Sequence, residues 1–212
     1  MNYANLIDDT NLHADALESD IVDLCNEAKE IGSASVCVNP DYIELCKKLL
    51  NGTNVKVCTV IGFPLGSMTT ESKVFEAADA IKKGADEVDM VINISKLKDH
   101  HDEYVKNEIS RIKEACGNRV LKVILECCLL SDEEIVRACK LSKEAKADFV
   151  KTSTGFSKHG ATVKDVKLMR QTVGPDMGVK AAGGIRTPEE LKEMVEAGAT
   201  RIGASHGKNL IK

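Results

Sequence analysis

The sequence has no excess of positive charge, no long hydrophobic run and no cysteine pair at metal-binding spacing. Its 212 residues carry a net charge of −4, which argues against nucleic acid as the main partner. No apolar run approaches the ~20 residues of a transmembrane helix. Residues 1–9 lack the basic and apolar regions of a signal peptide. We therefore expect a cytoplasmic protein without a membrane partner.

The eight cysteines follow no recognisable pattern. No C-x-x-C pair exists, and the adjacent Cys127 and Cys128 suit neither an ordinary disulfide nor a zinc knuckle. The cysteines are scattered through predicted strands and helices, as small buried hydrophobic residues are in a reducing compartment. We expect no metal site.

The composition predicts one globular domain over residues 1–212. The hydrophobic fraction of 43% and the charged fraction of 29% are those of a soluble globular protein. The chain is long enough for one well-buried domain and too short for two comfortable ones. It contains no linker and no low-complexity tract.

Short apolar segments alternate with amphipathic segments along the chain. The predicted strands are residues 6–10, 35–39, 55–61, 87–94, 120–127, 147–152, 178–182 and 200–205. Between them, apolar residues recur at helical spacing, as in residues 21–31, 74–81, 104–112 and 135–141. Eight strands alternating with helices predict a (β/α)8 TIM barrel. The alternative is an open doubly wound sheet, which usually carries G-x-G-x-x-G after its first strand, and residues 8–13 have no such motif.

Two lysines stand at the ends of predicted strands. Lys151 ends the segment 147–151 and precedes T-S-T-G, and Lys180 precedes A-A-G-G. Lysine is costly to bury unless it is paired or used in chemistry. We interpret the pair as amine chemistry, in which one lysine forms a Schiff base and the other lowers the pKa of the first. Spacing alone does not decide which lysine is the nucleophile.

Asp89 is expected to point into the barrel, toward the two lysines. Strand alternation places Glu87, Asp89, Val91 and Asn93 on one side. A buried structural ion pair would explain one aspartate and one lysine. Two lysines with three acids at strand ends (Asp8, Asp89 and Glu126) favour a catalytic site instead. A second ammonium ~4 Å away, at an effective dielectric of ~20, supplies roughly 4 kcal/mol. That is nearly the ~4.6 kcal/mol needed to bring a lysine pKa from ~10.4 to ~7.

Two glycine-rich loops are typical of a phosphate site. One lies directly before a predicted helix start, where free N–H groups and the helix dipole favour an anion. The other follows the eighth predicted strand, and barrels of this kind frequently bind phosphate with the loops after strands seven and eight. The expected phosphate-binding residues are Gly155, Gly183, Gly184, Arg186, Gly203, Ser205 and His206.

Five segments of the chain resemble, in order, motifs of the deoxyribose-phosphate aldolase family. These are V-I-G-F-P-L-G (60–66), A-D-E-V-D-M-V-I-N (85–93), K-V-I-L-E (122–126), A-D-F-V-K-T-S-T-G-F (147–156) and V-K-A-A-G-G-I-R-T (179–187). The likeness covers nearly the whole chain, from about Leu6 to Gly207. It implies a class I, lysine-dependent aldolase with a (β/α)8 barrel.

The resemblance also implies roles for individual residues. Lys151 would form the Schiff base, Lys180 would lower its pKa, and Asp89 would take part in proton transfer with an ordered water. Further residues are expected to contact the substrate: Asp8, Thr10, Cys37 and Thr152. The implied reaction is the reversible cleavage of 2-deoxy-D-ribose 5-phosphate to D-glyceraldehyde 3-phosphate and acetaldehyde. It requires no metal and no cofactor beyond the imine with Lys151, and a homodimer is common in the family.

The sequence differs from the family pattern at two sites. Many members read D-H-T where this chain has Asp8, Asp9 and Thr10, so Asp9 adds negative charge near the expected site. His206 replaces the second of two serines, where it could contact phosphate or crowd it. Two alternatives remain. One is an aldolase for another short sugar phosphate or for an unphosphorylated aldehyde, and the other is a non-catalytic barrel whose lysines only bind anions.

Overall fold

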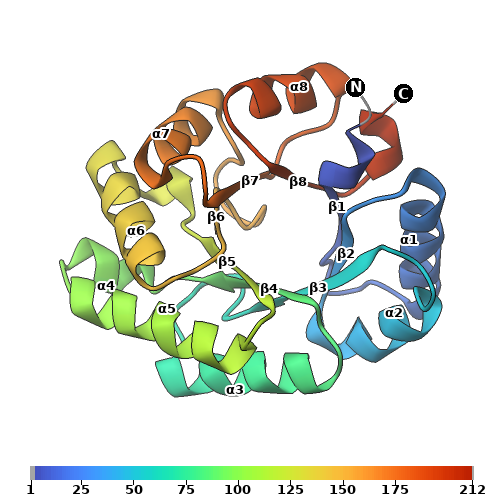
Figure 1. The fold of residues 1–212 in the computed structure, drawn as a ribbon, viewed down its shortest axis with the longest axis horizontal. Helices are drawn as coiled ribbons and strands as arrows, with labels where there is room; N and C mark the ends of the chain where they lie inside the picture. The colour runs from blue at the N-terminus through green and yellow to red at the C-terminus, as the bar shows by residue number, and fades with distance from the viewer. Residues whose placement is uncertain (1–2, 212) are drawn as a thin grey trace.

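Parallel strands close into a barrel in chain order, with β1 beside β8 (Figure 1). The computed structural model describes residues 3–211. Residues 1, 2 and 212, the ends of the expected domain, lie outside the described residues. The helices form a ring around the strands (Figure 1). The predicted (β/α)8 barrel is confirmed.

Each strand begins within two residues of its predicted start, and several strands end earlier than predicted. Their bounds are β1 Ile7–Asn11, β2 Ser35–Val38, β3 Lys56–Ile61, β4 Glu87–Val91, β5 Val120–Ile124, β6 Phe149–Lys151, β7 Gly178–Ala182 and β8 Arg201–Ala204. After β4, the Asn93 side chain accepts the Lys96 N–H (3.1 Å) and caps a short helix. After β5, Glu126 takes a left-handed conformation with φ of 59°. Both residues turn the chain away from the strand direction.

Side-chain caps start several of the helices. The α-helices are α1 Glu18–Ile31, α2 Ile43–Leu49, α3 Thr70–Lys82, α4 Ile94–Lys98, α5 Asp102–Cys116, α6 Asp132–Glu144, α7 Val163–Val173 and α8 Pro188–Glu196. Short 3-10 helices are η1 Ala4–Leu6, η2 Pro40–Tyr42, η3 Cys127–Leu129 and η4 Gly207–Leu210. The Thr187 hydroxyl oxygen accepts the Glu190 N–H, and the Glu190 carboxylate accepts the Thr187 N–H. This capping box fixes the chain between β7 and α8.

The core has two parts of different chemistry. Apolar side chains fill the space between the strands and the helices. Inside the barrel, by contrast, six ionisable side chains are at most 6% exposed, namely Asp8, Glu87, Asp89, Lys122, Lys151 and Lys180. Most barrels fill this space with branched apolar residues. The charged interior therefore marks the place where chemistry is to be sought.

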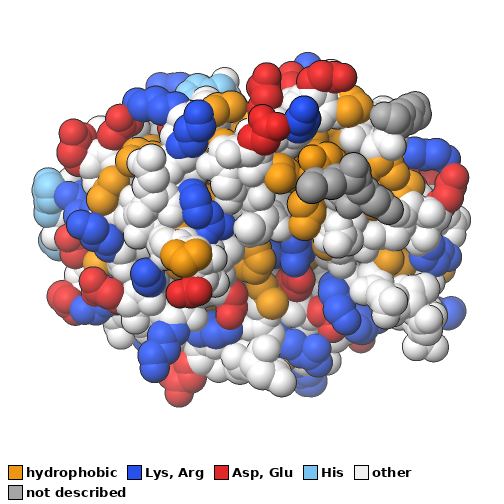
Figure 2. All heavy atoms as spheres, turned by 45° about the horizontal axis from the view of Figure 1, so that its top comes forward, with side chains coloured by type: hydrophobic (Ala, Val, Ile, Leu, Met, Phe, Trp, Pro, Cys, Tyr) orange, Lys and Arg blue, Asp and Glu red, His pale blue; other side chains and the backbone are white. Residues whose placement is uncertain are grey.

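The cysteines match the sequence prediction of small buried side chains. All eight are free thiols, and all except the partly exposed Cys128 are buried. Within residues 3–211, no helix is both long enough and apolar enough to span a membrane. The face shown in Figure 2 mixes basic and acidic side chains without a continuous basic stripe.

Candidate functional site

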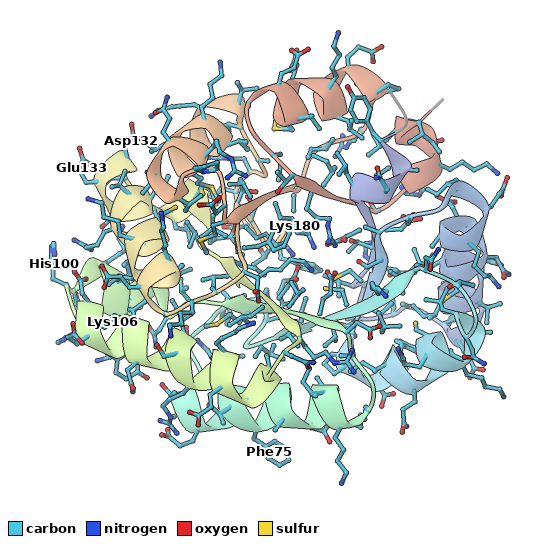
Figure 3. All side chains as sticks on the ribbon, viewed as in Figure 1. Phe75, His100, Lys106, Asp132, Glu133 and Lys180 are labelled. Atoms are coloured by element: carbon cyan, nitrogen blue, oxygen red, sulfur yellow. The ribbon has the colours of Figure 1, made fainter. Side chains whose placement is uncertain are left out.

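Asp89 on β4 joins three lysines inside the barrel. Its Oδ2 atom lies 2.8 Å from Lys151 Nζ and 2.7 Å from Lys180 Nζ. Its Oδ1 atom lies 2.8 Å from Lys122 Nζ. The structure thus brings together the aspartate and the two lysines that the sequence indicated. Figure 3 shows Lys180 inside the ring of strands.

Lys122 is the partner that sequence reasoning missed. It lies on β5, fully buried, and its Nζ also contacts Glu87 (2.5 Å), Asp8 (3.4 Å) and the Cys58 Sγ atom (3.2 Å). The signal was present in the sequence, because Lys122 is the only charged residue in the apolar run V-L-K-V-I. A lone lysine in such a strand must face a polar interior or solvent.

A second layer of ion pairs lies beside Asp89. Asp8 on β1 contacts Lys180 (2.5 Å) and Arg201 (2.6 Å), and it accepts the Ser35 hydroxyl (2.7 Å). Arg201 also contacts Glu87 (2.9 Å). Each charge in this network therefore has a partner of opposite sign, which offsets the cost of its burial.

The ion pairs shift the pKa values of the buried groups. Burial by itself raises the pKa of Asp89, but the three lysines outweigh it and hold the pKa well below its usual range. Burial lowers the pKa of Lys180, yet Asp8 and Asp89 outweigh it and hold the pKa above its usual range. The same balance raises the pKa of Lys122. Asp89 is therefore an anion, and Lys122 and Lys180 are cations, at neutral pH.

Charge balance singles out Lys151. Three carboxylates in the barrel (Asp8, Glu87 and Asp89) face three permanent cations, Lys122, Lys180 and Arg201. Lys151 is the third amine and the fourth basic side chain of the cluster. It can be an uncharged amine without leaving any of these carboxylates unpaired, and a neutral amine is the form that attacks a carbonyl.

A cavity of about 370 Å³ opens at the carboxyl ends of β1, β6, β7 and β8. Of the three lysines that contact Asp89, only Lys151 is among the residues that line it. The full lining is Thr10, Leu12, His13, Lys151, Thr154, Gly155, Phe156, Ala182, Gly183, Gly184, Ile185, Arg186, Gly203, Ala204 and Ser205. A molecule in this cavity therefore meets the Lys151 amine, with Lys180 and Asp89 behind it.

The loops predicted to bind phosphate form one side of this cavity. Gly183 and Gly184 both have positive φ (86° and 81°), which suits glycine and turns the chain between β7 and α8. Gly160 packs against this turn so closely that a Cβ there would lie 2.0 Å from the Gly183 oxygen. Arg186, also on the cavity wall, has an exposed side chain. Backbone N–H groups and a guanidinium at a helix start suit an anionic group.

Four predicted contact residues do not line the cavity. Asp8 lies deeper, among the cations. The Thr152 hydroxyl donates to the Ala182 oxygen (3.2 Å) and accepts the Ala182 N–H (3.1 Å), so it joins β6 to β7 instead. His206 is exposed and lies outside the lining because the chain turns after Ser205 toward Asp9. Cys37 is fully buried in the barrel wall.

Cys37 faces a second thiol that the sequence reasoning did not single out. Cys37 on β2 and Cys58 on β3 are register partners and belong to a small apolar cluster with Leu12 and Val60. A hydrogen bond from Cys58 lowers the pKa of Cys37, although burial opposes the shift. The pair lies close behind the lysines, since Cys58 Sγ is 3.2 Å from Asp89 Oδ1.

Glu126, a strand-end acid in the sequence analysis, holds the loop that follows Lys151. Its carboxylate accepts the Thr154 N–H (3.2 Å) and the Thr154 hydroxyl. The Thr154 oxygen in turn accepts the Phe156 N–H (3.0 Å). Phe156 meets Phe63 edge to face, with ring centres 5.3 Å apart. These contacts shape the wall beside Gly155, and sequence reasoning missed the contribution of Thr154 and Phe156.

Two triplets of side chains within the described residues have metal-site spacing, with ligand atoms within 4.8 Å of one another. They are Cys37, Cys58 and Asp89, and Asp8, Cys58 and Glu87. The carboxylates of both triplets are ion-paired with lysine or arginine. Those cations supply the charge balance that a metal would bring, so we assign neither triplet to a metal.

The comparisons with known proteins agree with this geometry. The family model of the DeoC/LacD family aldolases matches residues 3–211. The deoxyribose-phosphate aldolase of Thermoanaerobacter pseudethanolicus is 61% identical over 98% of this chain and 94% of its own length. That of Bacillus subtilis is 59% identical over all of this chain and 96% of its own. The solved tetrameric deoxyribose phosphate aldolase of Aeropyrum pernix superposes with a TM-score of 0.89 at 36% identity, covering 98% of this chain and 88% of that one. The chain belongs to the DeoC/LacD family of aldolases.

Proposed function

We propose that the chain is a class I aldolase that reversibly cleaves 2-deoxy-D-ribose 5-phosphate into D-glyceraldehyde 3-phosphate and acetaldehyde. The observation that carries the proposal is that Lys151, alone of the three lysines that contact Asp89, lines the cavity, while Lys180 and Asp89 lie directly behind it. The names of the relatives at 59–61% identity supply the substrate.

In this mechanism, the neutral Lys151 amine attacks the aldehyde carbon of the open-chain sugar, and loss of water gives an iminium. Removal of the proton from the C3 hydroxyl then breaks the C2–C3 bond and releases glyceraldehyde 3-phosphate. The iminium accepts the electron pair, so an enamine of acetaldehyde remains on Lys151. Protonation of the enamine carbon and hydrolysis of the imine release acetaldehyde. No cofactor beyond this covalent imine is required.

Asp89 and Lys180 are the groups that we assign to proton transfer, through an ordered water. Their contact of 2.7 Å lets a proton move between them, and the same Asp89 oxygen lies 2.8 Å from the Lys151 nitrogen. Asp8 forms an ion pair with Lys180, which holds the Lys180 side chain in place and stabilises its positive charge.

The phosphate end of the sugar is assigned to the two glycine-rich loops and to Arg186. Gly155, Gly183, Gly184, Gly203 and Ser205 line the cavity together with Arg186. Thr10 and His13, which also line the cavity, are in position to meet the sugar hydroxyl groups. The partner is thus a small sugar phosphate. A homodimer stays a prediction, which light scattering of the purified protein checks.

Product analysis tests this function. Incubation with 2-deoxyribose 5-phosphate is expected to release glyceraldehyde 3-phosphate and acetaldehyde in equal amounts. Replacing Lys151 by methionine is expected to lower kcat by more than about 10³-fold, because the nucleophile is lost. Lys167→Met, an exposed lysine on α7, is the matched control and should keep wild-type activity.

Competition between substrates separates the alternatives. Unphosphorylated 2-deoxyribose should show a kcat/KM lower by about 10²-fold or more, as loss of charge-assisted hydrogen bonds of ~1.5–3 kcal/mol each predicts. Equal efficiency for both sugars would assign the enzyme to unphosphorylated aldehydes. Binding of sugar phosphate without any cleavage would support a non-catalytic barrel.

A further inference from the structure

Asp9 faces away from the ion-pair network, although its neighbour Asp8 lies within it. Alternation along β1 points Asp8 into the barrel and Asp9 outward. Asp9 is nonetheless fully buried, and its Oδ1 atom accepts the Gly207 N–H at 3.1 Å. The sequence predicted that Asp9 adds negative charge near the site, and the structure places its carboxyl group behind the cavity wall.

Asp9 holds the loop after β8 at both ends. Its backbone pairs with Ala204 across β1 and β8, and its side chain binds Gly207 three residues later. Gly203, Ala204 and Ser205 line the cavity at the side assigned to phosphate. Gly207 fits tightly, since a Cβ there would lie 3.2 Å from Asp9 Cγ. The turn at residues 205–206 is thus bracketed by contacts to one residue.

The start of η4 is anchored by two further carboxylates from α1. Glu27 accepts the Lys208 N–H (3.0 Å), and Glu30 pairs with Lys208 Nζ (2.8 Å). In Figure 1 the C-terminal segment lies close to β1 and α1. Asp9 and Glu27 therefore hold neighbouring N–H groups of the same short segment.

A negative charge on Asp9 has no cationic partner among the described residues. Within residues 3–211, no lysine, arginine or histidine lies within 4.0 Å of its carboxylate. Its Oδ2 atom is buried and accepts no hydrogen bond. From α1, the groups that face it are Glu27 and the Cys25 thiol. From η4, it meets only the Gly207 N–H, because Lys208 turns toward Glu30. Asp8 and Arg201 lie on the opposite side of β1.

We propose that Asp9 is a positioning residue for the loop at residues 203–207, and that the charge on its carboxyl group tunes how strongly this loop binds the substrate phosphate. The proposal rests on the proposed function, since it assigns a role to the phosphate side of the same site. It concerns residues that touch the substrate only through the loop.

The protonation state of Asp9 changes near neutral pH. Burial raises the pKa of Asp9 to about 7, and Glu27 adds to the rise while the Gly207 N–H opposes it. Below this pH, the protonated carboxyl group carries no charge, and Oδ1 still accepts from Gly207. Above it, the Asp9 and Glu27 carboxylates repel each other, and a negative charge lies behind the part of the cavity wall that is assigned to the substrate phosphate. Phosphate affinity is therefore expected to fall as the pH rises through 7.

Steady-state kinetics from pH 6 to pH 8.5 test the proposal. In the wild type, KM for 2-deoxyribose 5-phosphate is expected to rise on the order of threefold across this range, as one screened charge near a dianion predicts. Asp9→Asn keeps an acceptor for Gly207 without a titrating charge and should abolish the rise. kcat, and the KM for unphosphorylated 2-deoxyribose, should show no difference between the two proteins. The ionisation of the substrate phosphate, near pH ~6, is common to both and cancels.

Two further variants sharpen the comparison. Glu27→Gln removes a charge that adds to the effect of burial on the pKa of Asp9, so the rise in KM should move to lower pH. Glu30→Gln changes an exposed carboxylate that anchors the same segment without facing Asp9, and it should keep the wild-type profile. Circular dichroism establishes that each variant is folded.

Calorimetric titration with inorganic phosphate gives the same comparison without catalysis. Cleavage of the sugar with identical KM profiles for wild type and Asp9→Asn would overturn the role of Asp9 and leave the proposed function intact. If the protein does not cleave the sugar but its phosphate affinities follow the predicted pH pattern, the proposed function is overturned and the role of Asp9 stands. A protein that binds no phosphate at any pH would overturn the proposal as well.

Discussion

Asp89 holds three amines with two oxygen atoms, and this arrangement gives each lysine a different task. The three lysines together keep Asp89 ionised and hold its pKa well below its usual range. Lys151 shares the Oδ2 atom with Lys180 and is the amine that meets the cavity. Asp89 therefore acts on the chemistry through its charge and through its contact with Lys180.

Replacing Asp89 by asparagine is expected to separate imine formation from proton transfer. Asparagine keeps the shape of the side chain but cannot accept a proton, so kcat should fall by about 10²–10⁴-fold, the usual contribution of general acid–base catalysis. Lys151 remains in place, so borohydride should still trap an adduct. A variant with wild-type kcat would show that Asp89 is only a structural ion-pair partner.

At the residue scale, the sequence predicted the inward direction of Asp89 and the presence of two interior lysines. It did not predict a role for Lys122, because functional residues were expected at strand ends and Lys122 lies in the middle of β5. It also placed Asp8 and Thr152 at the substrate. Their ion pairs and backbone hydrogen bonds depend on the barrel register, which a single strand pattern does not contain.

At the scale of elements, a buried ion pair between α3 and α5 closes the end of β4. Lys73 and Glu108 are fully buried and 3.0 Å apart. Lys73 donates to the Val91 oxygen (2.8 Å), and Glu108 accepts the Asn93 N–H (3.2 Å). Burial lowers the pKa of Lys73 and raises that of Glu108. The two helices thereby fix the strand end that lies just beyond Asp89.

Lys73→Met is expected to destabilise the protein by about 3–5 kcal/mol, because it leaves the Glu108 carboxylate buried without its cation. The double variant Lys73→Met, Glu108→Leu should be more stable than Lys73→Met alone. Urea unfolding at pH 7 measures both. Lys83→Met, which breaks an exposed pair with Asp79, is the control and should change stability little. Equal stability of the single and double variants would refute this account of the pair.

The alternation of elements was predictable because apolar periodicity changes between two and 3.6 residues at each boundary. The ends of β4 and β5 were not. Residues 92–94 and 125–127 continue the apolar pattern, and only the cap at Asn93 and the left-handed Glu126 end the strands. Each of these turns depends on a single residue, and a periodic pattern over many residues does not reveal the effect of one.

At the scale of the whole molecule, the barrel gathers residues from distant parts of the sequence at one site. Asp89 and Lys180 are 91 positions apart in the chain and lie 2.7 Å apart in space. The glycine-rich loops after β7 and β8 were predictable from the position of phosphate sites in such barrels. The shape of the cavity was not, because Thr154 and Phe156 reach it through contacts with Glu126 and Phe63.

The most direct test of this account is to trap the covalent intermediate. The protein is treated with 2-deoxyribose 5-phosphate and borohydride, and peptide mass spectrometry then locates the modified residue. We predict an adduct on Lys151 that is absent from Lys151→Met. An adduct mainly on Lys180, or no adduct in a protein that binds the sugar phosphate, would contradict the account.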